Sequence, residues 1–76
     1  MDEAEKILQE NPCSINELAA LLGCSVSKIH RLTTTGATAI DGRTVVLDIV
    51  RTESGKKTSL GAYQRFQLEL NSRKEP

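Results

Sequence analysis

The chain has very few aromatic residues: no tryptophan, one tyrosine and one phenylalanine among 76 residues. A core without large rings must be built from aliphatic side chains, and a chain of this length makes a single small domain. Long apolar runs are also missing, since none approaches the roughly 18–20 residues that a membrane-spanning helix needs. The opening residues 1–12 are acidic and interrupted, unlike a secretory signal peptide. We therefore expect a cytoplasmic protein with no membrane partner.

Cysteine and histidine are scarce as well, which excludes several kinds of chemistry. The two cysteines, Cys13 and Cys24, are too few for a disulfide scaffold, and we interpret them as buried, reduced thiols. With the single histidine, His30, they would lack the fourth ligand and the paired short spacing of a zinc site. No phosphate-binding glycine loop and no Ser/His/Asp or Cys/His set is recognisable. We therefore expect no metal, no cofactor, no small-molecule substrate and no enzymatic activity.

Acidic and basic residues balance at a net charge of zero, which by itself argues against a nucleic-acid-binding protein. Their distribution is uneven, however: residues 1–25 carry a net charge of −4, residues 26–57 carry +3 and residues 58–76 carry +1. Positive charge thus collects in the middle of the chain. Chance skew of a solvated surface is the alternative explanation.

The most informative segment is residues 15–32, INELAALLGCSVSKIHRL. Two apolar stripes at helical spacing are separated by Gly23, a residue type that readily ends a helix in the left-handed conformation. A capping box begins at Ser14, and Ser25 caps the second helix, which is expected to end at Gly36. The stripes consist of Leu18, Ala19 and Leu22 in the first helix and Val26, Ile29 and Leu32 in the second.

Two short helices joined across a glycine turn are the pattern of a helix-turn-helix, whose second helix enters a DNA major groove. An ordinary pair of helices in a small core has the same apolar stripes and is the alternative. The glycine at the turn, the serine cap and the basic outward face of the second helix favour DNA binding.

A short helix over residues 2–9 is expected before this motif, and Asn11-Pro12 ends it, because the residue before a proline disfavours helical angles. Its buried face is predicted to be Ala4, Ile7 and Leu8.

After residue 37 the pattern becomes β-rich. We expect a tight turn at residues 40–43, a strand over residues 44–51, a hairpin turn at residues 52–56 centred on Ser54-Gly55, and a return strand at residues 57–58. A last helix over residues 60–70 follows the cap Ser59, and Leu68 falls outside its inward stripe. That stripe consists of Ala62, Tyr63, Phe66 and Leu70.

The order of these elements predicts a single domain over residues 1–76, mainly α with a small β-hairpin, in the winged helix-turn-helix arrangement. Its expected parts are an extra N-terminal helix and link (1–13), the helix-turn-helix (14–36), a hairpin wing (37–58), a C-terminal helix (59–71) and a polar tail (72–76).

The segments SINELAALLG and CSVSKIHRLTTTG resemble the helix-turn-helix of the excisionase and MerR-type winged-helix family. Members typically have a serine-capped second helix, a basic or aromatic pair and a closing glycine, places taken here by Ser25, His30-Arg31 and Gly36. The later SGKKTSLGAYQRF is similar to that family's wing return and last helix. The resemblance covers residues 14–70 and extends to small bacterial proteins of this length. It implies a winged helix-turn-helix that binds DNA in transcription regulation or recombination.

Outward polar residues of the second helix are the candidates for reading base edges, and Arg31 is the first choice because a guanidinium can bond both O6 and N7 of guanine. Basic residues of the wing are candidates for an adjacent groove or phosphate contact, with an ordinary charged turn as the alternative. The candidate DNA-binding residues are Ser25, Ser27, Lys28, His30, Arg31 and Thr34 in the helix-turn-helix, and Arg43, Arg51, Lys56 and Lys57 in the wing.

The sequence therefore predicts specific binding of double-stranded DNA, as a transcription regulator or an excisionase-type accessory factor. One small module buries only roughly 600–1,000 Å² on DNA, so a homodimer partner or a neighbouring DNA-bound protein would strengthen binding. The alternative is a protein–protein interaction module that uses the same helical scaffold without touching DNA.

Overall fold

A computed structural model describes residues 2–73, and within them the chain forms four helices and a set of short strands. Residues 74–76 of the expected polar tail lie outside the described residues. The helices are α1 (Glu3–Gln9), α2 (Ile15–Leu22), α3 (Val26–Thr34) and α4 (Leu60–Leu70). The strands are β1 (Cys13–Ser14), β2 (Ala37–Thr38), β3 (Thr44–Val45), β4 (Val50–Thr52) and β5 (Gly55–Thr58).

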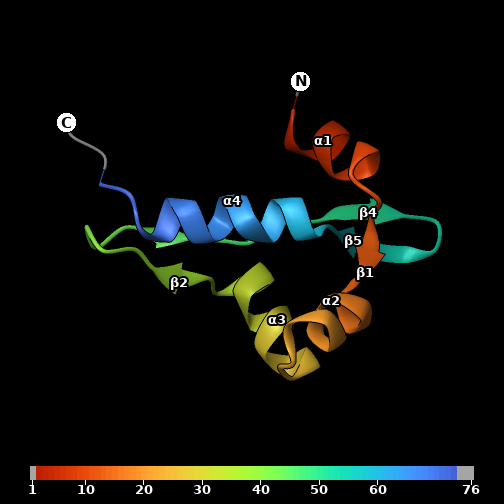
Figure 1. Ribbon diagram of the computed structural model, residues 1–76, viewed down its shortest axis with the longest axis horizontal. Coiled ribbons are helices and arrows are strands. Elements are labelled where there is room, and N and C mark those ends of the chain that lie inside the picture. Colours follow the sequence, from red (N-terminus) through yellow and green to blue (C-terminus); the bar gives the residue numbers. More distant parts are fainter. Residues whose placement is uncertain (1, 74–76) are drawn as a thin grey trace.

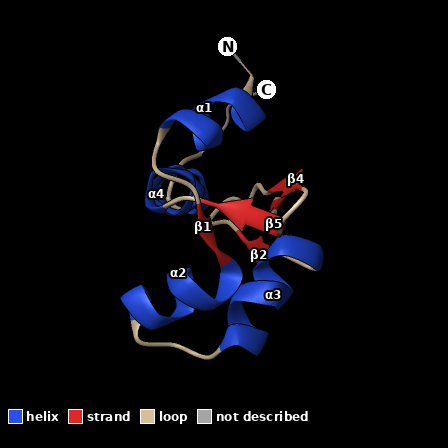
Figure 2. Cartoon of the chain, turned by 90° about the vertical axis from the view of Figure 1, so that its right-hand side faces the viewer, coloured by secondary structure: helices blue, strands red, loops and turns tan. Residues whose placement is uncertain are grey.

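The elements are arranged around α4, which runs along the long axis of the molecule (Figure 1). α1 lies on one side of α4, and the α2–α3 pair lies on the other (Figures 1 and 2). The fold is thus mixed α/β, with four helices and a small antiparallel sheet, and the predicted helices are all present.

Three strands form one antiparallel sheet in the order β1-β5-β4. β4 and β5 are the expected hairpin, in which Val50 lies opposite Lys57. β1 pairs with the other edge of β5 and places Cys13 opposite Thr58. The sequence does not predict β1, because two residues are too few to show the alternation by which a strand is recognised.

The predicted single strand over residues 44–51 is wrong, because its two ends pair with different partners: β3 pairs with β2, and β4 pairs with β5. Between them the Leu47 amide donates to the Leu32 carbonyl at the end of α3, 2.8 Å away. The predicted inward face survives the interruption, since Leu47 is buried and both Val45 and Ile49 are half-buried. This segment therefore connects the hairpin to α3 instead of continuing the sheet.

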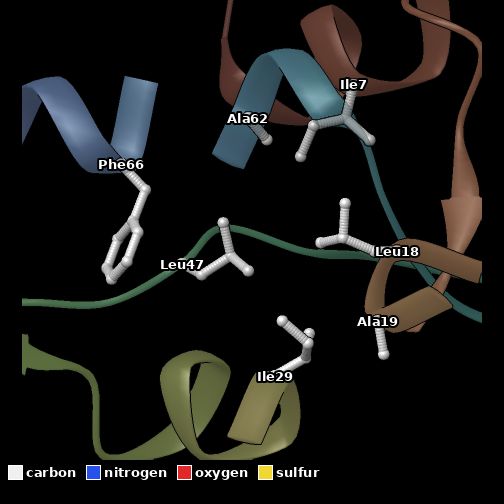
Figure 3. Packing of buried hydrophobic residues seen from close by; sticks show 7 residues of the cluster. All are labelled: Ile7, Leu18, Ala19, Ile29, Leu47, Ala62 and Phe66. Atoms are coloured by element: carbon white, nitrogen blue, oxygen red, sulfur yellow. The ribbon is translucent and has the colours of Figure 1, made fainter. Parts of the chain in front are cut away.

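The core is aliphatic apart from one phenylalanine, as the composition predicts. Leu47 lies at its centre, between Ile29 of α3 and Phe66 of α4 (Figure 3). The buried cluster consists of Ile7, Leu18, Ala19, Ile29, Leu47, Ala62 and Phe66.

α1 contributes only Ile7 to this core. The prediction that Ala4 and Leu8 are also buried is wrong, since both are exposed and Leu8 retains half of its accessible surface. α1 is a seven-residue helix that contacts α4 and β4 along one narrow side, so a single apolar side chain reaches the interior.

α2 and α3 begin and end where the local sequence predicts. Ser14 Oγ accepts from the Glu17 amide while the Glu17 carboxylate accepts from the Ser14 amide, each at 3.0 Å. Gly23 ends α2 with φ +69°, a left-handed conformation that a Cβ disfavours. Ser25 Oγ then accepts from the Lys28 amide at 3.1 Å and caps α3. These contacts fix the turn between the two helices.

α1 is fastened to α4 by a polar cluster around Arg65. The guanidinium bonds Glu10 Oε2 at 2.7 Å and also binds the Glu3 carboxylate. The Ser59 hydroxyl donates to Glu10 Oε1 at 3.0 Å. Gly61 lies against the same carboxylate, since a Cβ at this position would be 2.6 Å from Glu10 Oε2. The N-terminal helix is therefore an integrated part of the fold.

This cluster predicts a specific loss of stability in acid. The hydrogen bond from Arg65 is the main cause that holds the pKa of Glu10 below its ordinary value of 4.5; burial opposes it, and the Ser59 bond lowers the pKa further. A carboxylate with a lowered pKa contributes its full stabilisation above 4.5 and loses it as the pH falls through the lowered value. We therefore expect Glu10→Gln to unfold more easily than wild type near neutral pH, and the difference to shrink below 4.5.

Urea denaturation at a series of pH values measures this difference. Glu53→Gln is the matched control, because Glu53 is an exposed carboxylate with no ion-pair partner among residues 2–73. A deficit of Glu10→Gln that stays constant from neutral pH to acid would contradict the assignment.

Candidate nucleic-acid interface

α3 presents positive charge that no acidic residue of its own segment neutralises. The sequence contains no Asp or Glu between Glu17 and Asp41. Lys28 and Arg31 are exposed, and neither forms an ion pair within the described residues. Ser27 and His30, which were predicted to contact DNA from the same helix, are exposed as well.

The opposite face of α3 is anchored to the core. Ile29 is fully buried, Leu32 is half-buried, and the Leu32 carbonyl accepts the Leu47 amide. The prediction that Val26 faces inward is wrong, because 44% of its surface is exposed. Val26 is the first residue of α3 and lies one turn before Ile29, beyond the edge of the core. α3 is thus held from its middle and its end, which leaves its first turn open to solvent.

The hydroxyl groups at the two ends of α3 differ in what they can donate. Thr34 Oγ1 lies 3.2 Å from the His30 carbonyl and 3.3 Å from the Arg31 carbonyl, so its only proton is directed into the helix. A phosphate oxygen is an acceptor and gains no bond from Thr34 in this rotamer. Ser25 Oγ instead accepts from the Lys28 amide, which leaves its proton available.

The β4–β5 hairpin divides its basic residues between two faces. Arg51 lies opposite Lys56, so these two side chains share a face. Lys57 points to the other face, where it lies opposite Ser14 of β1. The pKa of Glu17 is lowered first by its hydrogen bonds with Ser14 and further by the nearby charge of Lys57. Strand geometry thus separates the two adjacent lysines, and Lys57 already has a carboxylate in its neighbourhood.

The tip of the hairpin is a two-residue turn. Thr52 pairs with Gly55, so Glu53 and Ser54 occupy the centre, one residue earlier than the predicted Ser54-Gly55. Gly55 has φ +112°, a conformation that favours glycine. The exposed carboxylate of Glu53 therefore lies at the tip, beyond the two cations that share a face.

The prediction that Arg43 belongs to the same basic hairpin as Arg51, Lys56 and Lys57 is wrong. Arg43 lies at the β2–β3 turn, where its guanidinium bonds Asp41 and Glu69, each at 2.6 Å, and the Ser72 carbonyl at 3.1 Å. The hydrogen bonds to Glu69 and then to Asp41 raise the pKa of Arg43. Asp41 is only two residues before Arg43, but Glu69 is 26 residues away along the chain, so no local pattern indicated that second ion pair. Its charge is neutralised within the fold.

α3 and the β4–β5 strands lie on the same side of the molecule, whereas α2 and α4 lie on the other (Figure 2).

A cavity of about 270 Å³ lies between α1, α4 and the segment before β4. Its charged lining has three carboxylates and one guanidinium, which repel a phosphate backbone more than they attract it. The cavity is lined by Glu3, Val45, Val46, Asp48, Arg65, Phe66 and Glu69.

Both cysteines are reduced and half-buried, where the sequence predicted full burial. Burial, followed by the charge of Glu17, raises the pKa of the Cys13 thiol.

The described part of the chain contains no group of three or more His, Cys, Asp or Glu side chains placed to hold a metal ion. Nor does any helix within residues 2–73 have the length and apolar character needed to cross a membrane.

Comparison with models of protein families, with curated proteins and with solved structures returned no match. The interpretation of the site therefore rests on the geometry and charge described above.

Proposed function

We propose that this protein is a winged helix-turn-helix protein that binds double-stranded DNA, with α3 in the major groove and the β4–β5 hairpin against the adjacent backbone. Arg31, Ser27 and His30 are the residues that contact base edges. Lys28 binds phosphate from the same helix, and Arg51 and Lys56 do so from the hairpin. Transcription regulation and an excisionase-type accessory role both use this binding.

The observation that carries the proposal is the contrast between two groups of cations. Arg43 and Arg65 are each bonded to two carboxylates. Lys28, Arg31, Arg51 and Lys56 have no ion-pair partner within the described residues, and they lie on elements that share one side of the molecule. Cations left without carboxylates on one side give a locally positive surface on a chain of zero net charge. Such a surface is what a phosphate backbone requires.

Substitution of Arg31 tests the proposed contact to bases. We expect Arg31→Ala to weaken binding to the preferred duplex, selected from a random pool, by about 1–3 kcal/mol and to relax the preference at one base pair. Fluorescence anisotropy with selected and scrambled duplexes measures both effects. Lys6→Ala is the control, since it removes an equal charge from exposed α1 on the far side of α4.

The same titration, repeated over a range of salt concentrations, separates the hairpin lysines. Lys56→Ala should weaken all duplexes alike and reduce the salt slope by about one, because a phosphate contact releases a counterion regardless of sequence. Lys57→Ala should have the smaller effect, since Lys57 faces Glu17 and β1.

Absence of binding to any duplex at low salt would overturn the proposal and favour a protein partner. An unchanged base preference in Arg31→Ala would overturn only the role of that residue.

A further inference from the structure

The outward face of α4 carries no charge. Leu60, Gln64 and Leu68 follow one another at intervals of four residues and are all exposed, Leu60 to 44% and Leu68 to 71%. Residues four apart lie above one another on a helix, so the three form one stripe. Phe66 and Ala62 point the other way, into the core (Figure 3). We name Leu60, Gln64 and Leu68 the α4 stripe.

The two charged residues of α4 are engaged elsewhere. Arg65 binds Glu3 and Glu10 of the α1 region, and Glu69 binds Arg43. In a chain of which 26% of the residues are charged, an exposed helix face without any charge is notable, since solvated helix faces are normally charged. Depletion of charge around exposed large apolar side chains is typical of the centre of a protein interface.

We propose that the α4 stripe is a homodimer interface, in which α4 packs antiparallel against α4 of a second copy of this chain. A two-fold axis places the same surface on both sides of an interface, so every residue there must tolerate a copy of itself or of its symmetry mate. A charged face would repel its own copy, whereas this neutral face does not. The inference does not depend on DNA binding.

The spacing of the stripe fits this symmetry. Gln64 lies midway between Leu60 and Leu68, so an antiparallel pair about Gln64 brings Leu60 of one copy to Leu68 of the other. Gln64 then meets Gln64 of the second copy, and a carboxamide is both donor and acceptor, so it can bond its own copy. Gln64 makes no side-chain hydrogen bond within the described residues, whereas Gln67 is already bonded to the Tyr63 hydroxyl at 2.9 Å.

The pairing also fits the rest of the molecule. In the end-on view α4 lies on the side of the molecule away from β4 and β5 (Figure 2). α3 and the hairpin lie on the opposite side and stay accessible in the dimer. One pair of short helices covers less than the roughly 800 Å² per partner of a standard interface, so the dimer is expected to dissociate reversibly, with a dissociation constant of about micromolar or weaker.

Sedimentation equilibrium of the full-length protein at several concentrations, without DNA, tests the proposal. We expect a reversible monomer–dimer equilibrium for wild type and an increase of at least about tenfold in the dissociation constant for Leu68→Glu. The double variant Leu60→Lys with Leu68→Glu should regain association, because in the antiparallel arrangement each introduced ammonium meets the introduced carboxylate of the other copy. A parallel arrangement would place like charges together and would not be rescued.

Leu21→Glu is the matched control, since Leu21 lies on α2 and is 68% exposed, close to the exposure of Leu68. It should dimerise as wild type does, and circular dichroism checks that each variant is folded. Wild type that stays monomeric at millimolar concentration, or Leu68→Glu that dimerises as well as Leu21→Glu does, would overturn the proposal. Failure of the double variant to regain association would overturn the antiparallel geometry.

Discussion

We expect Gly36→Ala to lower the free energy of unfolding by about 2–5 kcal/mol. Gly36 follows α3 with φ +80°, in the left-handed region where a Cβ costs about 1–2 kcal/mol. A Cβ at this position would also collide with the Val45 carbonyl oxygen of β3 and lie 3.0 Å from its carbonyl carbon. These are backbone atoms held by the β2–β3 pairing, so they cannot move aside as a flexible side chain would.

Gly23→Ala separates the two causes. Gly23 has a similar φ of +69°, but a Cβ there would meet nothing within 4 Å. Its substitution should therefore show the conformational cost alone, about 1–2 kcal/mol. Denaturation with urea gives both values under the same conditions. Equal losses for the two alanine variants would show that the close approach of Gly36 to β3 does not contribute.

Ile29→Ala is expected to lower the free energy of unfolding by about 2–5 kcal/mol, because it removes a fully buried side chain and leaves a cavity. Ile29 faces Leu47 at the centre of the core and is the only fully buried side chain that α3 contributes among the described residues (Figure 3). A domain of this size has a total stability of about 4–11 kcal/mol, so the loss is a large part of it.

Ile29→Val provides the graded comparison, since removal of one methyl group should cost about 0.5–1.5 kcal/mol. Thermal and urea denaturation measure both variants. If Ile29→Ala cost no more than Ile29→Val, α3 would not be anchored at this position, and its proposed orientation toward DNA would lose its support.

Helix boundaries were the most predictable part of the structure. The capping box of Ser14 and Glu17, the left-handed Gly23 and the cap at Ser25 all appear as expected. Each depends on hydrogen bonds between residues three or four apart, so the short-range sequence contains all the partners. The inward stripe of α4 was predictable for a related reason, because helical spacing alone decides which residues share a face.

Positions near the edge of the core were predicted less well. Leu8 and Val26 satisfy the helical pattern, yet both are exposed. Helical periodicity predicts which side of a helix a residue lies on. It does not predict whether another element of the fold extends far enough to cover that residue. The prediction of one strand over residues 44–51 failed for a similar reason. Its alternation of inward and outward side chains is correct, but its first residues pair with β2 and its last residues pair with β5, and a local pattern does not contain these pairing partners.

The candidate site shows the same division. Exposure of Lys28 and Arg31 followed from the spacing of α3, whereas the engagement of Arg43 did not, since its Glu69 partner lies 26 residues away. Adjacent residues of a strand point to opposite faces, so Lys56 and Lys57 separate in any strand. The register of β5 with its two neighbours decided that Lys56 shares a face with Arg51 and Lys57 with Ser14. The integration of α1 depends on Arg65 and Glu3, which are 62 residues apart.

The order of residues alone thus specified where each helix starts and stops and which of its sides turns inward, because backbone caps and helical periodicity act over a single turn. Only the folded arrangement decided which cations keep their charge exposed and which are neutralised. Ion pairs join groups that are close in space and often remote along the chain, so their outcome depends on how the elements pack together.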